Sequence, residues 1–387
     1  MSINTRSPYY ITSGVPNTHY GELAIQIWTG DGTATATPVI YTIKKFAASG
    51  SIQLNFEISE LIRDYLDVTF DGDYDTPLVW VRSVLKIYNT ADATPISTIP
   101  YGTQSAFESY DYFVEGGLFN IEYKSLLMSN REIFVLSDNS FRIPVHTRTN
   151  PTVSFIKNGV LLSSQTFSGQ TASSNQIEYV SVNGLNTNYD SFKSRVLLDG
   201  TNIAPSAFEN SKCLRDFFEE FEIGEVDTVR VKGTDGLQEI KITTVDECKY
   251  EPKKVTFVNR FGVLQDMFFF KKSVEKMNVK KESFKANTRD AQSQFSTSNH
   301  VNRDFNLVAK ESVTLSSGYL SEEYNEVFRQ LMLSEKVWVT NVNDTAVQVL
   351  PINVKTSDIT YKTSLNDKLV EYTIEFDNSF DTINNIR

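Results

Sequence analysis

The chain has 387 residues, a formal net charge of −11, and 26 phenylalanines and 18 tyrosines spread along its length. This length exceeds one ordinary core and suggests two or three domains of about 150 residues each. The negative charge excludes a global attraction to nucleic acid or to an anionic membrane, and the aromatic content favours half-buried β surfaces over helix bundles. We therefore predict a mainly β protein whose basic contacts are local.

Cysteine usage and hydropathy indicate the compartment. Cys213 and Cys248 are the only cysteines, too few for a disulfide framework and without the paired spacing of a zinc site. The opening MSINTRSPYYITSG lacks the apolar run of a signal peptide, and no stretch of roughly 18 apolar residues predicts a spanning helix. We expect reduced thiols, synthesis in a cytoplasm and no membrane insertion.

The first hundred residues alternate between strand and turn signals. ELAIQIW places Leu23, Ile25 and Ile27 on one face, and SIQLNFEI repeats the alternation, so both predict half-buried antiparallel strands. SELIRDYL then has apolar residues at helical spacing, which predicts a short amphipathic helix with Ser59 as its N-cap. PLVWVRSVLKIY predicts the next strand.

An internal repeat links this segment to the middle of the chain. FEISELIRDY at 56–65 matches FENSKCLRDF at 208–217, an offset of 152, and at the same offset Val79 falls on Val231. Cys213 takes the place of an apolar residue on the helix stripe, which predicts a core residue and not a nucleophile.

The middle segment also carries its own β signals, because Asn158-Gly159 between apolar runs predicts a hairpin. We predict two related β-sandwich-like modules, at 1–115 and 116–250, followed by an α+β domain at 251–387.

In the third segment, KKVTFVNRFGVLQDMFFFKK predicts two strands around a turn at 259–262, with Gly262 in a left-handed conformation. DAQSQFSTSNHVNRDFN is polar and is expected to form an exposed loop. An amphipathic helix is predicted from Ser321 to Leu333, and the strands KVWVTNV, VQVLPINVKT and KLVEYTIEFDNS complete an antiparallel sheet beneath it.

Four consecutive large apolar residues require burial on both faces of their strand. The predicted helix covers one face, and we expect the other face to meet either the second β module or a neighbouring subunit, with lysines on the rim. The predicted interface residues are Met267, Phe268, Phe269, Phe270, Lys271 and Lys272.

Lysines dominate the stretch from Lys271 to Arg289, and two interpretations stay open. The first is a solvated strand face, and the second is an electrostatic seat for an acidic neighbouring subunit. Nucleic-acid binding ranks below both because the stretch lacks the aromatic spacing of a base-stacking surface.

Candidate catalytic residues are sparse. His19, His146 and His300 lie in different segments, and none has another histidine at metal-ligand spacing or stands beside a nucleophile motif. No enzyme activity, cofactor or resident metal is therefore predicted.

One acidic turn resembles part of a calcium-binding loop. Asp71, Asp73 and Asp75 resemble half of a calcium loop, but Thr76 and Arg82 stand where such a loop has glycine and glutamate. An acidic turn is the default interpretation, and calcium binding stays open.

Residues 247 to 380 resemble virion proteins of the tail tip or baseplate of tailed bacteriophages, particularly marine ones. The resemblance is carried by ECKYEPKKVTFVNRFGVLQDMFFFKK, SSGYLSEEYNEVFRQLMLSEKVWV and YTIEFDNSF, and the N-terminal RSPYYI and FEISELIRDYL fit the same group. It implies assembly and not catalysis, and it leaves the position as hub, ring or fibre adaptor open.

Residues and resemblance together predict a structural virion component located in the tail, which acts by oligomerisation, as a trimer or hexamer ring, and by docking other phage tail proteins. The alternative is a module or adaptor that binds a host-surface glycan or receptor, with Trp28, Trp80 and Trp338 as candidate stacking residues. A glycan-degrading enzyme is a third and less favoured class, since it needs a facing carboxylate pair that sequence does not locate.

Overall fold

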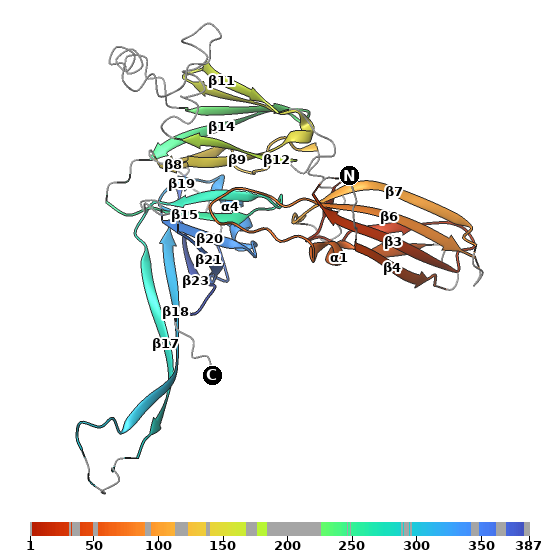
Figure 1. Ribbon diagram of the computed structural model, residues 1–387. Helices are drawn as coiled ribbons and strands as arrows, with labels where there is room; N and C mark the ends of the chain where they lie inside the picture. Colours follow the sequence, from red (N-terminus) through yellow and green to blue (C-terminus); the bar gives the residue numbers. More distant parts are fainter. Residues whose placement is uncertain are drawn as a thin grey trace, which may run out of the picture. The chain divides into compact units, whose positions relative to one another are not determined.

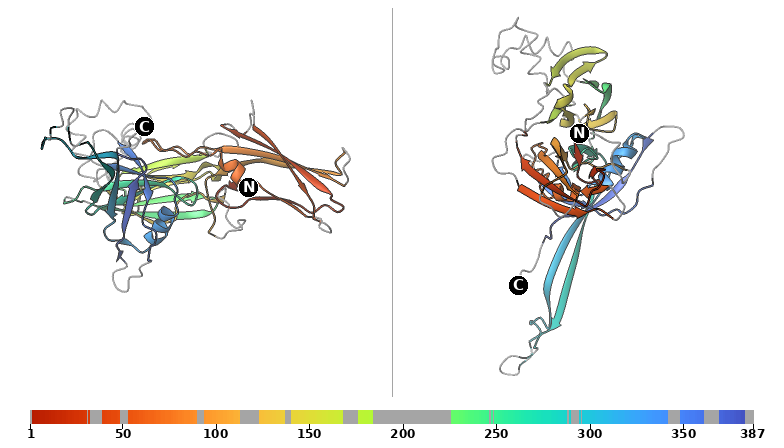
Figure 2. Two further views of the ribbon diagram at one scale, coloured as in Figure 1. Left: turned by 90° about the horizontal axis from the view of Figure 1, so that it is seen from below. Right: turned by 90° about the vertical axis from the view of Figure 1, so that its right-hand side faces the viewer.

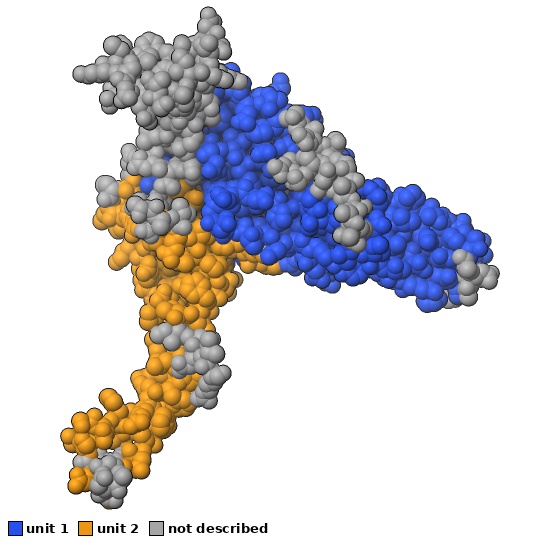
Figure 3. Space-filling model, viewed as in Figure 1, with its two compact units in different colours: residues 1–246, 257–267, 326–334 blue, residues 247–256, 268–325, 335–387 orange. Residues whose placement is uncertain are grey.

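A computed structural model of the chain describes residues 2–30, 32, 39–48, 53–89, 94–112, 123–136, 140–167, 176–183, 226–245, 247, 249–287, 289, 294, 296–341, 348–360 and 369–382. The fold is mainly β, as predicted. Contacts divide the chain into two compact units, shown in two colours in Figure 3. Unit 1 comprises residues 1–246, 257–267 and 326–334, and unit 2 comprises 247–256, 268–325 and 335–387.

The N-terminal module in unit 1 is a mixed sheet with strand order β1-β7-β6-β3-β4 (Figure 1). Edge strand β1 runs parallel to β7, whereas the other neighbours are antiparallel. A separate pair, β2 with β5, precedes the short helix α1. The bounds are β1 Ile3–Asn4, β2 Tyr10–Ser13, β3 Tyr20–Thr29, β4 Val39–Phe46, β5 Leu54–Glu57, α1 Ser59–Arg63, β6 Val79–Tyr88 and β7 Ser97–Phe107.

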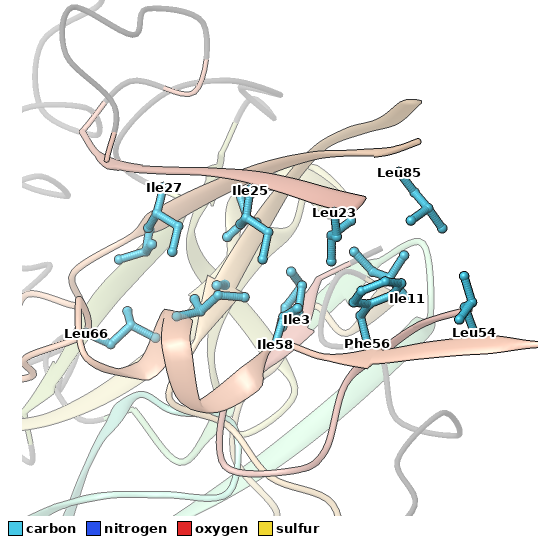
Figure 4. Packing of buried hydrophobic residues seen from close by; sticks show 14 of the residues in the cluster. Ile3, Ile11, Leu23, Ile25, Ile27, Leu54, Phe56, Ile58, Leu66 and Leu85 are labelled. Atoms are coloured by element: carbon cyan, nitrogen blue, oxygen red, sulfur yellow. The ribbon is translucent and has the colours of Figure 1, made fainter. Parts of the chain in front are cut away.

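The core of this module lies between the sheet and the β2–β5 pair with α1. Figure 4 shows Leu23, Ile25 and Ile27 of β3 facing Phe56 and Ile58, and all five are at most 2 % exposed. The predicted alternation in these strands is therefore confirmed, as is the short helix. The predicted N-cap is wrong, because Ser59 is the first residue of the helix and Ile58 is its N-cap. The five-stranded sheet thus packs against a layer formed by the β2–β5 pair and α1.

The second module in unit 1 has a sheet of order β11-β10-β13-β14-β8, and β9 pairs with β12 beside it. The predicted hairpin is confirmed: β10 and β11 pair across Asn158 and Gly159, which have positive φ angles of 47° and 79°. The bounds are β8 Glu132–Leu136, β9 Ser140–His146, β10 Thr152–Lys157, β11 Val160–Thr166, β12 Ile177–Asn183, β13 Thr228–Gly233 and β14 Gly236–Val245.

The two modules share one topology when their strands are taken in chain order. Each sheet has one parallel edge pair, β1 with β7 and β8 with β14, followed by antiparallel neighbours in the same sequence. In each, the second and fifth strands form a separate antiparallel pair. Val79 of β6 and Val231 of β13 lie in corresponding strands, whereas the repeated segment 208–217, with Cys213, lies outside the described residues.

A third sheet has the order β16-β15-β20-β21-β23-β18-β17. The boundary between the units passes through β15, β16 and helix α4, so each of these elements contributes residues to both units. The bounds are β15 Lys253–Val258, β16 Leu264–Phe269, β17 Val274–Lys285, β18 Asn302–Ser316, β19 Leu320–Ser321, α4 Tyr324–Met332, β20 Val337–Asn341, β21 Val349–Val354, β22 Leu369–Val370 and β23 Thr373–Asn378.

The turn between β15 and β16 has the predicted form. Gly262 has φ +76°, and its N–H donates to the carbonyl of Asn259 over 2.9 Å. The fully buried Asn259 uses its whole amide: Nδ2 donates to the Leu127 carbonyl and to Gln265 Oε1, and Oδ1 accepts from the N–H groups of Phe261 and Val263. The turn is thereby fixed against the second module.

Helix α4 is shorter than predicted, because it begins at Tyr324 and not at Ser321. The expected apolar stripe is present, with Val327, Phe328 and Leu331 at most 1 % exposed. Within unit 1, Gln330 Oε1 accepts from the backbone N–H of Arg260 over 3.3 Å. The central residues of the helix are therefore core residues.

A cluster of cations and tyrosines fixes the α4 segment inside unit 1. The Arg329 guanidinium lies 3.6 Å and that of Arg260 4.6 Å from the centre of the Tyr112 ring, and Tyr112 donates a hydrogen bond to Glu326. Arg260 also pairs with Asp111 over 3.3 Å. The cations over the Tyr112 ring and the charge-assisted hydrogen bonds make this a partly buried polar contact, in which the Asp111 side chain is 6 % and the Arg329 side chain 42 % exposed.

Candidate interaction surface

The predicted interface run is buried within the single chain. Met267, Phe268, Phe269 and Phe270 are at most 4 % exposed. Within unit 2, the Phe268 and Phe270 rings stack with centroids 6.0 Å apart, and Phe269 meets Phe376 edge-on at 6.1 Å. These four side chains leave no apolar surface for a neighbouring subunit, which corrects the interface interpretation: they are core residues.

The second β module contacts the beginning of β16, before the run of Met267 to Phe270. The backbone N–H of Leu264 donates to the Tyr179 hydroxyl over 3.0 Å, and Asp266 accepts from the N–H of Arg142 over 3.3 Å. The chain therefore covers this segment without a partner molecule.

The two rim lysines have different surroundings. Lys271 Nζ lies 2.9 Å from Glu247 Oε2, and this hydrogen bond lowers the pKa of Glu247. Lys272 is exposed. Among the described residues, Lys272 has no ion-pair partner, and it directly precedes a longer basic element.

That element is the antiparallel hairpin of β17 and β18, which we call the arm. Every residue of β17 is exposed, and its large apolar residues Val274, Met277, Val279 and Phe284 are 48 to 55 % exposed. Figure 1 and the right-hand view of Figure 2 show the arm running beyond the other strands of unit 2. A hairpin of this length with exposed apolar residues is marginally stable in water by itself.

A solvated strand was one of the two interpretations of the segment that forms β17, but the beginning of its partner strand, β18, was not predicted. The polar segment ending at 306 was expected to be a loop, yet β18 begins at Asn302 and pairs with β17 from there. Residues 302–306 are polar apart from Phe305, so they carry no apolar alternation to signal a strand. The expectation of a loop is wrong from Asn302 onward.

The arm has two chemically different faces. Paired residues of an antiparallel ladder share a face, and successive residues alternate. Between the pairs Lys280–Val308 and Glu282–Phe305, β17 contributes one residue and β18 two, so β18 holds a bulge at Asn306, whose φ is +53°.

The first face, which we call the apolar face, carries Met277, Val279, Leu307 and Ala309 at its centre. Charged residues of the same face flank them, namely Glu275, Lys281, Lys285, Asp304 and Glu311, and Lys281 pairs with Asp304 over 2.8 Å. A pocket of about 200 Å³ within unit 2 includes Glu275 and Glu311 of the same two strands. Ligand pockets for small molecules are commonly about 300 to 1,000 Å³, so this pocket is small for such a role.

The second face, the basic face, carries charge and aromatic rings together. Its residues are Val274, Lys276, Asn278, Lys280, Glu282 and Phe284 of β17 with Arg303, Phe305, Val308 and Lys310 of β18. The rings of Phe284 and Phe305 meet edge-on with centroids 5.6 Å apart, which agrees with their placement on one face. Lys276 and Lys280 form no ion pair with any described residue.

Unit 1 contains a surface of opposite charge, the acidic strip of Asp67, Asp71, Asp73 and Asp75. All four residues are exposed, whereas Leu66, Val68, Phe70 and Thr76 of the same segment are buried. The Tyr74 hydroxyl contacts both carboxylate oxygens of the buried Asp266, at 2.6 and 2.7 Å, and Thr76 bonds to the Tyr179 hydroxyl. Buried bonds on one side thus hold the carboxylates of the strip toward solvent.

The calcium motif weighed in this segment forms a turn. Asp71 Oδ1 accepts from the N–H of Asp73 over 3.1 Å, and Gly72 between them has φ +118°. Among the described residues, no group of three or more His, Cys, Asp or Glu side chains is arranged to hold a metal ion.

The tryptophans assigned to glycan stacking are buried. Trp28, Trp80 and Trp338 are 7, 3 and 8 % exposed, and Trp80 Nε1 donates to the Gly30 carbonyl over 2.7 Å. The expectation that these rings offer a face to a sugar is wrong, because each belongs to the interior.

No helix in the described part of the chain has the length and apolar character to cross a bilayer.

The three histidines lie in different surroundings. His146 is fully buried at the end of β9 and its ring lies 6.2 Å from that of Phe107, whereas His19 packs against Tyr20 and Phe46, and His300 is exposed. The structure therefore does not bring the three together.

Comparison of the sequence with known proteins finds no matching family model and no similar curated protein.

Proposed function

We propose that this protein is a structural component of a phage tail tip or baseplate, which acts by oligomerisation and by docking neighbouring tail proteins. The observation that carries the proposal is the arm. Beyond the residues of β18 that pair with β23, the arm is a two-stranded hairpin whose β17 residues are all exposed. Such a hairpin is marginally stable in water, and burial against another molecule would stabilise it. The resemblance in residues 247 to 380 supplies the tail as the setting.

Two further features support a role in assembly. Strands β4 and β11 are the corresponding edge strands of the two modules, and both expose large apolar residues, 40 to 64 % exposed. These residues are Val39, Ile40, Phe46, Val160 and Leu161. Exposed apolar edges are the templates through which sheets join other chains.

We also infer that the two β modules arose by duplication. The shared strand order, the parallel edge pair in each sheet and the match of Val79 with Val231 support this inference. Each chain would then carry two similar docking edges, so a trimer would present six similar modules to a neighbouring structure with six-fold symmetry. This match of symmetries favours a closed ring in the tail. The expected domains at 1–115, 116–250 and 251–387 stay part of this proposal.

Localisation in the particle tests the tail assignment. Antibodies raised against the purified chain should label the tail end of virions in negative-stain electron microscopy, and mass spectrometry of purified tails should detect the chain. Labelling of the capsid, or detection only in the infected-cell lysate, would contradict the proposal. Antibodies preabsorbed with the purified chain provide the control.

A further inference from the structure

We propose that the basic face of the arm docks on the acidic strip of a second copy of this chain. The inference rests on the proposed structural role and names the partner surface in the homo-oligomer. One chain thus carries both halves of a head-to-tail contact, which is the kind of contact that closes a ring of identical subunits.

Charge is the first argument for this occupant. On the basic face, Lys276 and Lys280 of β17 and Arg303 of β18 are exposed, and Glu282 is the acidic residue beside them. On the acidic strip, four exposed aspartates follow within nine residues, and the segment itself contains no lysine or arginine. The one described cation over it is Arg142 of β9, whose guanidinium lies 5.4 Å from the centre of the Tyr74 ring, so the four aspartates keep the strip acidic. Complementary potentials of this kind steer association and fix its register, and like charges exclude wrong partners.

The chemistry of the arm also argues against two other partners, a second basic face and a purely apolar surface. Pairing of two basic faces would place lysines against lysines, which is unfavourable. A purely apolar partner would bury Lys276 and Lys280 without counter-charges, at a large desolvation cost. An acidic partner neutralises these lysines, while Phe284 and Phe305 at the distal part of the face contribute apolar area.

Preorganisation of the strip is the second argument. Tyr74 and Thr76 are held by Asp266 and Tyr179, so the backbone that carries Asp73 and Asp75 is fixed before any partner arrives. A surface that is ordered in advance loses little entropy on binding. The flexible lysine side chains of the arm then adapt to a rigid row of carboxylates.

Oligomeric state tests the contact. Light scattering coupled to size exclusion, over a concentration series at low and high salt, should show that the wild-type chain self-associates and that salt weakens the association. Charge reversal on the arm, K276E/K280E, should weaken it by about tenfold or more, and D73K/D75K on the strip should do the same. The two pairs combined should restore association, because the contact is then attractive again with its signs exchanged.

Lys285 provides the matched control. It is exposed on the same strand but alternates onto the other face of the arm, so K285E changes charge equally without touching the proposed contact. A monomeric wild type, an equal effect of K285E, or no restoration in the combined variant would each overturn the inference. Binding of an oligonucleotide that K276E/K280E abolishes, without self-association, would identify nucleic acid as the occupant and also overturn it.

The outcomes separate this inference from the tail assignment. A chain that labels virion tails but stays monomeric retains the structural role and loses the arm-to-strip contact. A chain that forms the charge-dependent oligomer but never appears in tails retains the contact and loses the tail assignment. Circular dichroism of each variant confirms that the β fold is intact.

Discussion

At the residue scale, Asn259 and Gly262 explain why the Asn-Arg-Phe-Gly turn has its sequence. Every hydrogen-bonding atom of the buried Asn259 side chain has a partner, and an unpartnered buried amide would cost about 1–3 kcal/mol. Gly262 is constrained both by its left-handed backbone and by space, because a Cβ there would lie 2.7 Å from the Glu108 carbonyl carbon.

We predict that Gly262→Ala destabilises the protein by at least about 1–3 kcal/mol, the cost of a left-handed non-glycine residue, before the clash with backbone is added. Gly102→Ala is the control, since a Cβ at Gly102 meets nothing within 4 Å. Urea unfolding of both variants measures the difference. Equal midpoints for the two would contradict the assigned constraint.

The aromatic residues near Arg260 give a second prediction at this scale, on pH. Burial raises the pKa of Tyr110 to about 12, although Arg6 above its ring opposes the shift. Burial and the hydrogen bond to Glu326 raise the pKa of Tyr112 as well. The folded chain therefore keeps these protons to higher pH than the unfolded chain, whose tyrosines titrate near 10.

The contribution of these tyrosines to stability is fully present below pH 10 and is lost as pH rises from 10 toward 12 and beyond. We predict that the free energy of unfolding declines over this range and that the decline is shallower in Tyr110→Phe. Denaturant unfolding at a series of alkaline pH values provides the measurement. An unchanged slope in the variant would show that Tyr110 titrates normally in the folded chain.

At the element scale, α4 is held by its buried stripe. Phe328 is fully buried, and replacement by alanine should cost about 3 to 5 kcal/mol, the usual range for emptying an aromatic core site. Leu333→Ala, just beyond the helix at a residue 45 % exposed, should change stability by no more than about 0.5 kcal/mol. Thermal unfolding of both variants tests the assignment, and a Phe328→Ala chain as stable as Leu333→Ala would refute it.

The elements that sequence predicted well are those with one buried face. The alternation in β3 and the helical spacing in α4 indicate which side chains are buried. The Asn158-Gly159 pair indicates a turn, because few other residues adopt the positive φ angles that such a turn requires. The strand that was missed, β18, begins in polar residues, because its distal part is solvated and hydrogen bonds to β17 define it. Burial of Met267 to Phe270 was expected, but sequence periodicity does not say which molecule provides the cover.

At the scale of the whole molecule, each compact unit is built from several separate segments of the chain. Residues 257–267 and 326–334 belong to unit 1 although they follow its modules in the chain. Phe261 and Val263 join Trp28, Trp80 and Phe107 in one buried cluster. Unit 1 is therefore completed by residues that are synthesised late.

We predict that a fragment ending at residue 250 is less stable than the same modules in the full chain, because the cluster around Trp28 and Trp80 loses Phe261 and Val263. Amide hydrogen exchange near Trp28 in β3 and Trp80 in β6 should be faster in the fragment. At the other end of the β3–β4 pair, where Tyr20 pairs with Phe46, the exchange rate should change little. Equal protection in fragment and full chain would show that the late segments add nothing to this core.

The bulge at Asn306 determines the chemistry of the arm through a single residue. Side chains of β18 before the bulge lie on opposite faces from those they would occupy in an unbroken strand. Loss of the bulge at constant length would pair Asn306 with Glu282 and Phe305 with Ser283, which would move Phe305 and Arg303 to the apolar face and bring Asp304 among the lysines. Deletion of Asn306 itself would leave Phe305 opposite Glu282. One residue in a left-handed conformation thus decides on which surface of the arm these aromatic and basic side chains lie, so this point tolerates removal of the extra residue better than a substitution that disfavours its positive φ.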